Sequence, residues 1–333
     1  MLVLGIESSC DETAAAVLKN GTLLLSNVIA SQIQIHSKYG GVVPELASRH
    51  HLEAILPVVE EALQQAGIEL TQVDGIAVTQ GPGLVGCLLV GMSFAKALSF
   101  VTGIPVVGVD HIAGHLLSVF LSEKKPPFPF IALVASGGHS SIYHAADFRT
   151  FRHLGRTRDD AAGEAFDKVA KLLGLGYPGG PLIAEQASRG KNAIAFPRSW
   201  LEPESLDFSF SGIKTAVVNH VKSNPEVSLP DVCASFQEAV VDVLVEKTIR
   251  AARNTDITSV VLAGGVAANR RLREHMTNRC NEEGIAVFMP APEFCTDNAA
   301  MIAMAGYHKL QIATPPDYEM DVYSRSQAAT LPS

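Results

Sequence analysis

Short apolar runs of strand length alternate with helix-period segments along most of this 333-residue chain. The short runs predict buried strands and the longer segments predict helices, several of them closed by a glycine. The expected strands are Leu2–Ile6, Ala14–Leu18, Gly75–Thr79, Pro105–Val109, Ile131–Val134, Val260–Ala263 and Ala286–Met289. The expected helices are His51–Ala66, Gly83–Thr102, Asp159–Gly174, Leu229–Arg253 and Ala268–Gly284. This alternation predicts an α/β protein rather than a helical bundle or a β-sandwich.

One pattern occurs twice, which suggests a duplicated fold. Leu2–Ile6 runs into a polar turn and a returning apolar run, and Ile131–Val134 does the same. Two ordinary hairpins would give this pattern. A duplicated nucleotide-binding fold would give it too, because glycine-rich turns at strand ends let a phosphate approach the backbone. A further glycine pair, Gly264-Gly265, fits the second reading, although the P-loop and dinucleotide fingerprints are absent. The length suggests about two domains, and Lys124–Pro129 is the best hinge.

Charge and cysteine content exclude several classes of protein. The net charge is −8, so nucleic acid would have to meet a local basic patch. The five cysteines form no CxxC pair, which argues against a disulfide framework and a thiolate zinc site. The first residues do not resemble a signal peptide, and the most apolar stretch, 83–109, is broken by glycines, Lys96 and Pro105. We therefore expect a cytoplasmic protein with no membrane partner, and a loosely held tail beyond Pro315-Pro316.

His111 and His115 are the sharpest local signal. On a helix, residues four apart lie on one face and can share a metal ion, although such histidines are also common as surface or capping residues. A carboxylate is the usual third ligand, and Asp297 is a candidate, with a helix N-cap as its plainer role. A zinc peptidase would have glutamate after the first histidine, where this chain has Ile112.

Two further segments concentrate acidic residues. The first loop, Glu7–Thr13, has a density of carboxylates and hydroxyls that suggests acid–base work or coordination of a phosphate-bound cation. Asp167 lies on a predicted helix, beside its apolar stripe, where it would suit ribose hydroxyls. Basic residues also cluster, and solvated surfaces are the default explanation for them. They are Arg149, Arg152, Arg156 and Arg158, and then Arg270, Arg271 and Arg273.

Taken together, the motifs resemble the TsaD family over nearly the whole chain. They are Gly5–Thr13, Tyr39–Arg49, Gly81–Leu84, His111–His115, Ser136–His139, Asp160–Lys171, Tyr177–Pro181, Asp207–Lys214, Ala263–Asn269 and Phe294–Asn298. Departures are few: Ala135 and Ala267 stand where many members have serine. The tail Tyr323–Ser326 also lacks the basic, Trp-containing end common in bacterial members, which puts tail contacts with tRNA or partners in doubt, but not the active site.

The resemblance implies a fold and an activity. The fold would be two duplicated actin-like, Hsp70-like (ASKHA) lobes around a nucleotide cleft, with lobes at 1–128 plus 298–333 and at 129–297. The activity would be transfer of a threonylcarbamoyl group from L-threonylcarbamoyl-adenylate to N6 of the adenosine 3′ to the anticodon. The tRNAs would be those reading codons that begin with A, and the product N6-threonylcarbamoyladenosine.

The resemblance also implies site residues and partners. His111, His115 and Asp297 would bind one divalent metal, Fe²⁺ first and Zn²⁺ second. A nucleotide (the adenylate, ATP or ADP) would be held by Val134, Ala135, Ser136, Gly137, Gly138, Asp167, Gly180 and Asn269. Ser9, Asp11 and Glu12 would form a catalytic or phosphate loop. The partners would be tRNA, a TsaB-like heterodimer mate and a TsaE-like ATPase.

Three other functions are weaker. A small-molecule kinase of the same fold would have no reason to hold the histidine pair, and a non-catalytic scaffold would be expected to have lost the three candidate ligands. A metallopeptidase lacks its general base because of Ile112.

Overall fold

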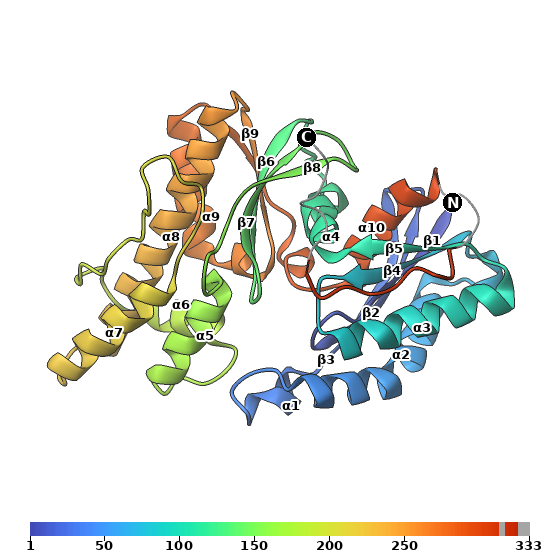
Figure 1. Ribbon diagram of the computed structural model, residues 1–333, viewed down its shortest axis with the longest axis horizontal. Helices are drawn as coiled ribbons and strands as arrows, with labels where there is room; N and C mark the ends of the chain where they lie inside the picture. Colours follow the sequence, from blue (N-terminus) through green and yellow to red (C-terminus); the bar gives the residue numbers. More distant parts are fainter. Residues whose placement is uncertain (313–316, 326–333) are drawn as a thin grey trace. The chain divides into compact units, whose positions relative to one another are not determined.

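The computed structural model describes residues 1–312 and 317–325. Two compact units make up the chain. Unit 1 comprises Met1–Lys125, Asp147–Phe151 and Asp297–Ser333, and unit 2 comprises Pro126–Ala146 and Arg152–Thr296. Each unit is built around one five-stranded sheet (Figure 1).

Unit 1 has the strand order β3-β2-β1-β4-β5. Its strands are β1 (Leu2–Glu7), β2 (Glu12–Lys19), β3 (Leu23–Ser31), β4 (Gly75–Gly81) and β5 (Val106–Asp110). Its helices are α1 (Ile33–Ser37), α2 (Pro44–Ala66), α3 (Val85–Thr102), α4 (His111–Leu117) and α10 (Ala299–Leu310), with 3₁₀ turns at Leu70–Gln72 and Ser118–Leu121. Helices α2 and α3 pack against the sheet and each other, and α10 packs across β1, β2, β4 and β5.

Unit 2 has the strand order β10-β9-β6-β7-β8. Its strands are β6 (Phe130–Ala135), β7 (Ser140–Ala145), β8 (Phe151–Arg156), β9 (Ser259–Ala263) and β10 (Ala286–Phe288). Its helices are α5 (Ala162–Leu172), α6 (Gly179–Ala187), α7 (Ser211–Ser223), α8 (Leu229–Asn254) and α9 (Arg270–Glu282), with 3₁₀ turns at Gly265–Ala268 and Pro292–Phe294. Helix α8 packs on β6 and β9.

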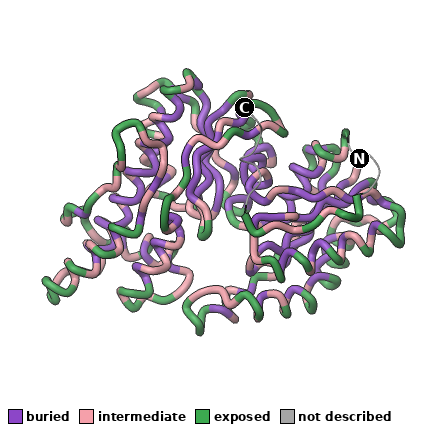
Figure 2. Tube along the Cα trace, in the orientation of Figure 1, coloured by how far each residue is buried: buried purple, intermediate pink, exposed green. Residues whose placement is uncertain are grey.

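The two sheets have the same topology, which confirms the predicted duplication. In unit 1, β1 pairs antiparallel with β2 and parallel with β4. In unit 2, β6 pairs antiparallel with β7 and parallel with β9. The central strands are almost wholly buried (Figure 2), which explains why β1 and β6 consist of continuous apolar runs.

The expected start of one helix was wrong, and several strands and helices, β3, β8 (Phe151–Arg156), α6 and α7 among them, were not expected. Helix α2 begins at Pro44 rather than at His51, because proline is favoured in the first turn of a helix, where its missing N–H costs nothing. Strand β3 was not expected, because its side chains are mostly half-buried and its apolar pattern is correspondingly weak.

The tail was also expected to be loosely held, and residues 317–325 are not. Lys96 Nζ donates to the Met320 carbonyl (2.5 Å), Gln80 Nε2 donates to that of Asp321 (2.7 Å), and Val322 packs against the core of unit 1. Pro315, Pro316 and Ser326 lie outside the described residues.

Among the described helices, only α3 is long and apolar enough to cross a membrane by length and composition. It lies in unit 1 against α2 and β4, as a layer helix of an α/β protein does.

Candidate metal centre and nucleotide-binding segments

The two histidines lie on α4, which begins directly after β5. Asp110 caps this helix: its Oδ1 accepts hydrogen bonds from the backbone N–H groups of Ile112 (2.9 Å) and Ala113 (3.1 Å). Both histidines are buried, and their ring centroids are 4.7 Å apart. The fold thus places both imidazoles on one face of a helix, as the four-residue spacing predicts.

Asp297 completes the group. Its Oδ1 lies 3.1 Å from His115 Nε2 and 3.4 Å from His111 Nε2, and one ligand atom from each of the three residues lies within 4.8 Å of the others. The simple capping role does not apply to Asp297, because the cap of α10 is its neighbour Asn298, which accepts from Met301 N at 3.0 Å. Two imidazole nitrogens and one carboxylate are a donor set that suits zinc or ferrous iron.

Glu7, at the end of β1, was expected only as one of the carboxylates of the first loop, and the structure places it beside the candidate metal centre. It is fully buried, and its Oε2 lies 3.0 Å from His111 Nδ1. Thr79 Oγ1 donates to the same oxygen at 2.7 Å. A carboxylate that accepts from Nδ1–H leaves Nε2 free as the ligand atom, which is the usual outer arrangement of a metal-binding histidine. The available signal was a glutamate ending an otherwise apolar strand.

The electrostatics of this group also favour a cation. Burial lowers the pKa of His111, but the charges of Asp297 and Glu7 outweigh burial and hold that pKa well above its ordinary value. Burial raises the pKa of Asp297, but His111 and His115 hold it well below its ordinary value. His115 Nδ1 is buried with no hydrogen-bond partner among the described residues. The donor set and its negative field therefore fit a divalent metal ion.

The first loop lies beside this centre. Ser9 Oγ is 3.3 Å from His111 Nδ1, and Asp11 is buried. Burial, together with the charges of Asp11 and Asp297, raises the pKa of Glu12 to about 9. A carboxyl group with this pKa is protonated at neutral pH, so Glu12 can donate a hydrogen bond there.

His51 of α2 was another residue that the sequence analysis missed. It is buried, its Nδ1 lies 2.7 Å from Thr13 Oγ1, and its Nε2 lies 2.9 Å from the Cys10 carbonyl. These contacts connect the middle and the last residue of the loop Glu7–Thr13 to α2.

In unit 2, Val134 and Ala135 are buried at the end of β6, and Ser136–Gly138 form the turn into β7. Ser136 N donates to the His139 carbonyl (2.8 Å), so this N–H is used within the turn. The backbone N–H groups of Gly137 and Gly138 have no partner among the described residues, and a methyl group at either glycine would meet nothing within 4 Å. The turn therefore offers two backbone N–H groups with no partner among the described residues, and its glycines leave room beside it.

Asp167 lies on α5 and holds the start of α6. Its Oδ1 accepts from Gly179 N at 2.7 Å. A methyl group at Gly179 would lie 2.6 Å from the Phe166 carbonyl, so that glycine is needed for close packing of the two helices. A methyl group at Gly180 would meet nothing within 4 Å, so the fold itself does not require that glycine.

Asn269 caps α9. Its Oδ1 accepts from Leu272 N (3.1 Å), and its Nδ2 donates to Gln237 Oε1 (2.8 Å). At Gly264, with φ of +88°, a side chain would collide with the Ala135 carbonyl, so the approach to α9 runs close to the end of β6. Within unit 2 the fold thus brings the β6–β7 turn, α5 and the start of α9 together.

Three of the clustered arginines contact other parts of unit 2 and so serve the fold. Arg158 pairs with Asp207 (2.9 Å), Arg271 pairs with Glu238 (2.6 Å), and Arg273 donates to backbone carbonyls. Arg152 and Arg156 of the edge strand β8 are exposed.

A second metal-like group, Glu238, Asp242 and His275, joins α8 to α9. Its two carboxylates already form ion pairs with arginines: Glu238 with Arg271 at 2.6 Å and Asp242 with Arg198 at 2.7 Å. It is therefore an ionic contact between helices rather than a metal site.

Two units of this sheet topology make up an actin-like fold, and other solved structures share that fold. A nucleotide-bound HypF matches with a TM-score of 0.64 at 14% identity, over 95% of this chain and 47% of that one. Component A of the Acidaminococcus fermentans (R)-2-hydroxyglutaryl-CoA dehydratase matches with a TM-score of 0.58 at 16% identity, over 93% of this chain and 99% of that one. At these identities the likeness shows the fold alone.

The family model for TsaD, tRNA N6-adenosine threonylcarbamoyltransferase, matches residues 23–304. A relative of that name from Syntrophus aciditrophicus is 58% identical over 98% of this chain and 97% of its own length. Another from Desulfotalea psychrophila is 59% identical over 98% of this chain and 97% of its own length. The chain belongs to the TsaD family of tRNA N6-adenosine threonylcarbamoyltransferases.

Proposed function

We propose that this chain transfers the threonylcarbamoyl group from L-threonylcarbamoyl-adenylate to N6 of the adenosine 3′ to the anticodon, in tRNAs that read codons beginning with A. In this reaction the N6 nitrogen attacks the carbamoyl carbon, a new C–N bond forms, and the bond from that carbon to the phosphate oxygen breaks. AMP leaves, and the N6 proton passes to a base. The family membership supports this reaction, and the group of His111, His115 and Asp297 is the single structural observation that carries it.

His111, His115 and Asp297 of unit 1 would hold one divalent metal ion, with Fe²⁺ as the preferred candidate and Zn²⁺ as the alternative. When bound, such a metal supplies a Lewis acid that polarises a carbonyl oxygen or stabilises negative charge on phosphate. Glu7 keeps the proton of His111 on Nδ1, so that Nε2 faces Asp297. Asp11 is the candidate that accepts the N6 proton, and protonated Glu12 and the Ser9 hydroxyl are candidates for holding the substrate through hydrogen bonds.

The residues of unit 2 would hold the nucleotide part of the substrate, and ATP or ADP in its place. The free N–H groups of Gly137 and Gly138 suit the phosphate, since adjacent backbone donors form an anion-binding turn. Asp167 suits the ribose hydroxyls, and the open space at Gly180 suits close approach of the ligand. Val134, Ala135 and Ser136 set the position of the turn, and Asn269 sets the start of α9. The N-terminal lobe of this enzyme would comprise residues 1–128 and 298–333, and the C-terminal lobe would comprise residues 129–297.

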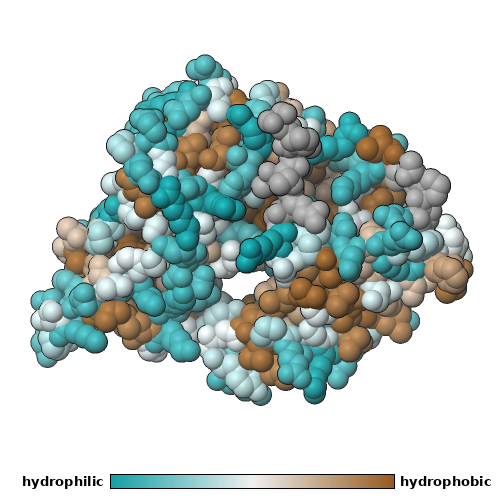
Figure 3. Space-filling model, in the orientation of Figure 1, coloured by the Kyte–Doolittle hydropathy of each residue, from teal (hydrophilic) through white to brown (hydrophobic). Residues whose placement is uncertain are grey.

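Partner proteins would contribute part of the tRNA-binding surface, because a chain with a net charge of −8 repels the negatively charged tRNA backbone. We propose a TsaB-like mate and a TsaE-like ATPase, and a cytoplasmic location that suits five free cysteines. Exposed apolar side chains on α2 and α3 support a protein mate, since a large apolar patch marks an interaction surface. They are Leu52, Leu56, Val85, Leu89, Phe100 and Val101. Figure 3 shows brown, hydrophobic residues gathered over this part of unit 1.

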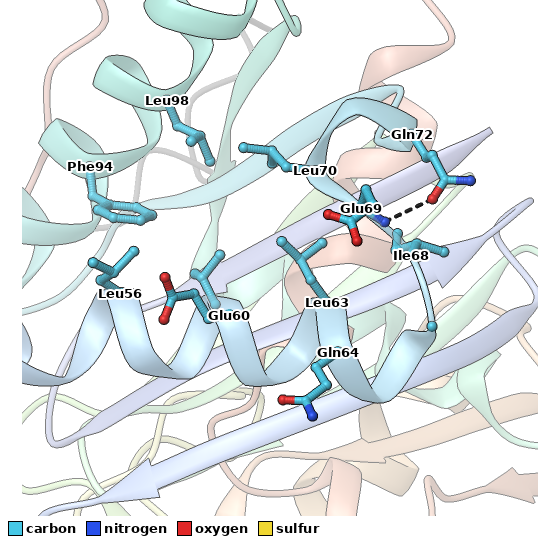
Figure 4. Close-up of a pocket in the computed structure, with 12 residues that line it drawn as sticks. Leu56, Glu60, Leu63, Gln64, Ile68, Glu69, Leu70, Gln72, Phe94 and Leu98 are labelled. Carbon is cyan, nitrogen blue, oxygen red and sulfur yellow. Dashed lines mark hydrogen bonds between the residues drawn. The ribbon is translucent and has the colours of Figure 1, made fainter.

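A groove of ≈ 540 Å³ adjoins this patch (Figure 4). Its apolar lining includes Leu56 and Leu63 of α2 and Phe94 and Leu98 of α3. None of the candidate metal or nucleotide residues lines it. The groove therefore suits the mate rather than the small-molecule substrate.

The test is a transfer assay with purified protein, its TsaB-like and TsaE-like mates, threonylcarbamoyl-adenylate and unmodified tRNA, read by mass spectrometry of nucleosides. Wild type is compared with the His111→Ala, His115→Ala double variant and with His275→Ala, whose histidine belongs to the other metal-like group. We expect modified adenosine from wild type and from His275→Ala, and none from the double variant. No product from folded, metal-loaded wild type would overturn the transferase proposal and favour a kinase or scaffold. Equal product from all three would keep the transferase and reject the metal assignment.

A further inference from the structure

The end of the described chain forms a strap along β4 and α3. This C-terminal strap, residues 317–325, is tied down by backbone contacts: Tyr323 N donates to the Gln80 carbonyl at 3.1 Å, and Lys96 and Gln80 donate to strap carbonyls. Met320 and Val322 pack against the core of unit 1. Gly81 is required for this seat, because a side chain there would collide with the Tyr323 carbonyl and ring.

The strap reaches the cap of the histidine helix through one hydroxyl group. Tyr323 Oη donates to Asp110 Oδ2 at 2.9 Å. The other oxygen of the same carboxylate, Oδ1, caps α4 through Ile112 N and Ala113 N. One carboxylate therefore connects the C-terminal strap with the first turn of α4, whose first residue is His111.

The Tyr323 hydroxyl group keeps its proton and can therefore always donate its hydrogen bond to Asp110. Burial, with the negative charge of Asp110, raises the pKa of the Tyr323 hydroxyl well above its ordinary value, so it stays protonated. A carboxylate held at both oxygens has one rotamer, and the N-cap geometry depends on that rotamer. Loss of the Tyr323 hydrogen bond would remove one of the contacts that hold this carboxylate toward the two N–H groups of α4.

We infer that Tyr323 is a positioning residue for the metal centre, and that the C-terminal strap fixes the histidine helix through Asp110. This inference rests on the metal assignment in the proposed function. The residue that Tyr323 contacts, Asp110, directly precedes His111 in the chain.

The test uses full-length Tyr323→Phe, which removes only the hydroxyl group, with Tyr318→Phe as the matched control. Tyr318 is the other tyrosine of the strap, and its hydroxyl lies 3.2 Å from Ser99 Oγ on α3, away from Asp110. The first readout is the dissociation constant for Zn²⁺ alone, measured by chelator competition. The second is hydrogen exchange of the Ile112 and Ala113 amides in metal-free protein, which does not depend on catalysis.

We expect Tyr323→Phe to weaken Zn²⁺ binding by about 3- to 10-fold. This is at or below the lower end of the affinity loss seen when a residue that hydrogen-bonds to a metal ligand is replaced, because Tyr323 acts through Asp110. We expect its two cap amides to exchange about fivefold faster, with Tyr318→Phe unchanged in both readouts. If Tyr323→Phe has the Zn²⁺ affinity and the amide exchange rates of wild type, the inference is wrong. It is also wrong if both variants change equally in these readouts, because that result indicates a general loosening of the strap. If wild type itself binds no Zn²⁺, the metal assignment fails, and this inference fails with it.

Discussion

Glu7 Oε2 lies 3.0 Å from Nδ1 of His111, and both side chains are buried. The carboxylate fixes the tautomer and the ring orientation of the histidine, so that Nε2 points toward Asp297, 3.4 Å away. Glu7, which is not one of the three candidate ligands, therefore contacts the ring nitrogen of His111 that does not face Asp297 in the candidate metal centre.

Replacing Glu7 by glutamine should lower metal affinity. Glu7→Gln keeps the side-chain volume but removes the charge that orients the imidazole and raises its basicity, so we expect about tenfold weaker Zn²⁺ binding. Chelator competition measures it, with the exposed Glu45→Gln as the control. An unchanged dissociation constant would show that Glu7 does not orient His111.

Glu12 should make metal-free protein less stable as the pH rises. The pKa of Glu12 is about 9 in the folded state, against an ordinary value of 4.5, because burial penalises its charge. Its contribution to stability is fully present below pH 4.5 and is lost as the pH rises toward 9, since in that range only the folded state holds the proton. Glu12→Gln, which stays neutral, should be the more stable protein at pH 8 by at least about 1.4 kcal/mol, the equivalent of one pKa unit.

The measurement is urea unfolding at pH 5 and pH 8 in the presence of a chelator. The exposed Glu123→Gln serves as the control and should follow wild type at both values. If wild type and Glu12→Gln lose stability in parallel between the two pH values, the raised pKa of Glu12 is wrong.

The neighbouring glycines 179 and 180 should respond in opposite ways to alanine. Gly179→Ala places a methyl group 2.6 Å from the Phe166 carbonyl and should destabilise the protein by about 1–3 kcal/mol. Gly180→Ala meets nothing within 4 Å and should leave the free energy of unfolding nearly unchanged while raising KM for the adenylate. Urea unfolding and steady-state kinetics separate the two effects. A normal KM in Gly180→Ala would remove Gly180 from the substrate site.

A charge on the α2–α3 surface should weaken binding of the protein mate without unfolding the chain. Leu52 is 67% exposed, so Leu52→Lys should leave stability within about 0.5 kcal/mol of wild type. Its affinity for the TsaB-like mate should fall by about tenfold or more, as for a central interface residue. Leu23→Lys, at a position of β3 that is 55% exposed, is the matched control for added charge. Equal affinities of both variants and wild type, measured by calorimetry, would place the mate elsewhere.

Local patterns predicted much of this protein. The alternation of strand and helix periods depends on neighbours within a few residues, and it predicted the α/β class, most of the elements and the duplicated hairpins. The four-residue spacing of His111 and His115 is also local, since it follows from the pitch of one helix. The tail beyond Pro315-Pro316 shows the limit of such patterns: its residues are polar, yet Tyr323 is held by Gln80 and Asp110.

By itself the sequence determined which segments become strands and helices, because periodicity and glycine placement act through the nearest residues along the chain. Tertiary structure alone decided what surrounds the histidines. Glu7 lies 104 positions before His111, and Asp297 lies 182 positions after His115. Only the parallel pairing of β1 with β4 and β4 with β5, and the packing of α10 across them, brings these groups together. Burial among them then sets the pKa values of His111 and Glu12, and no local pattern contains that information.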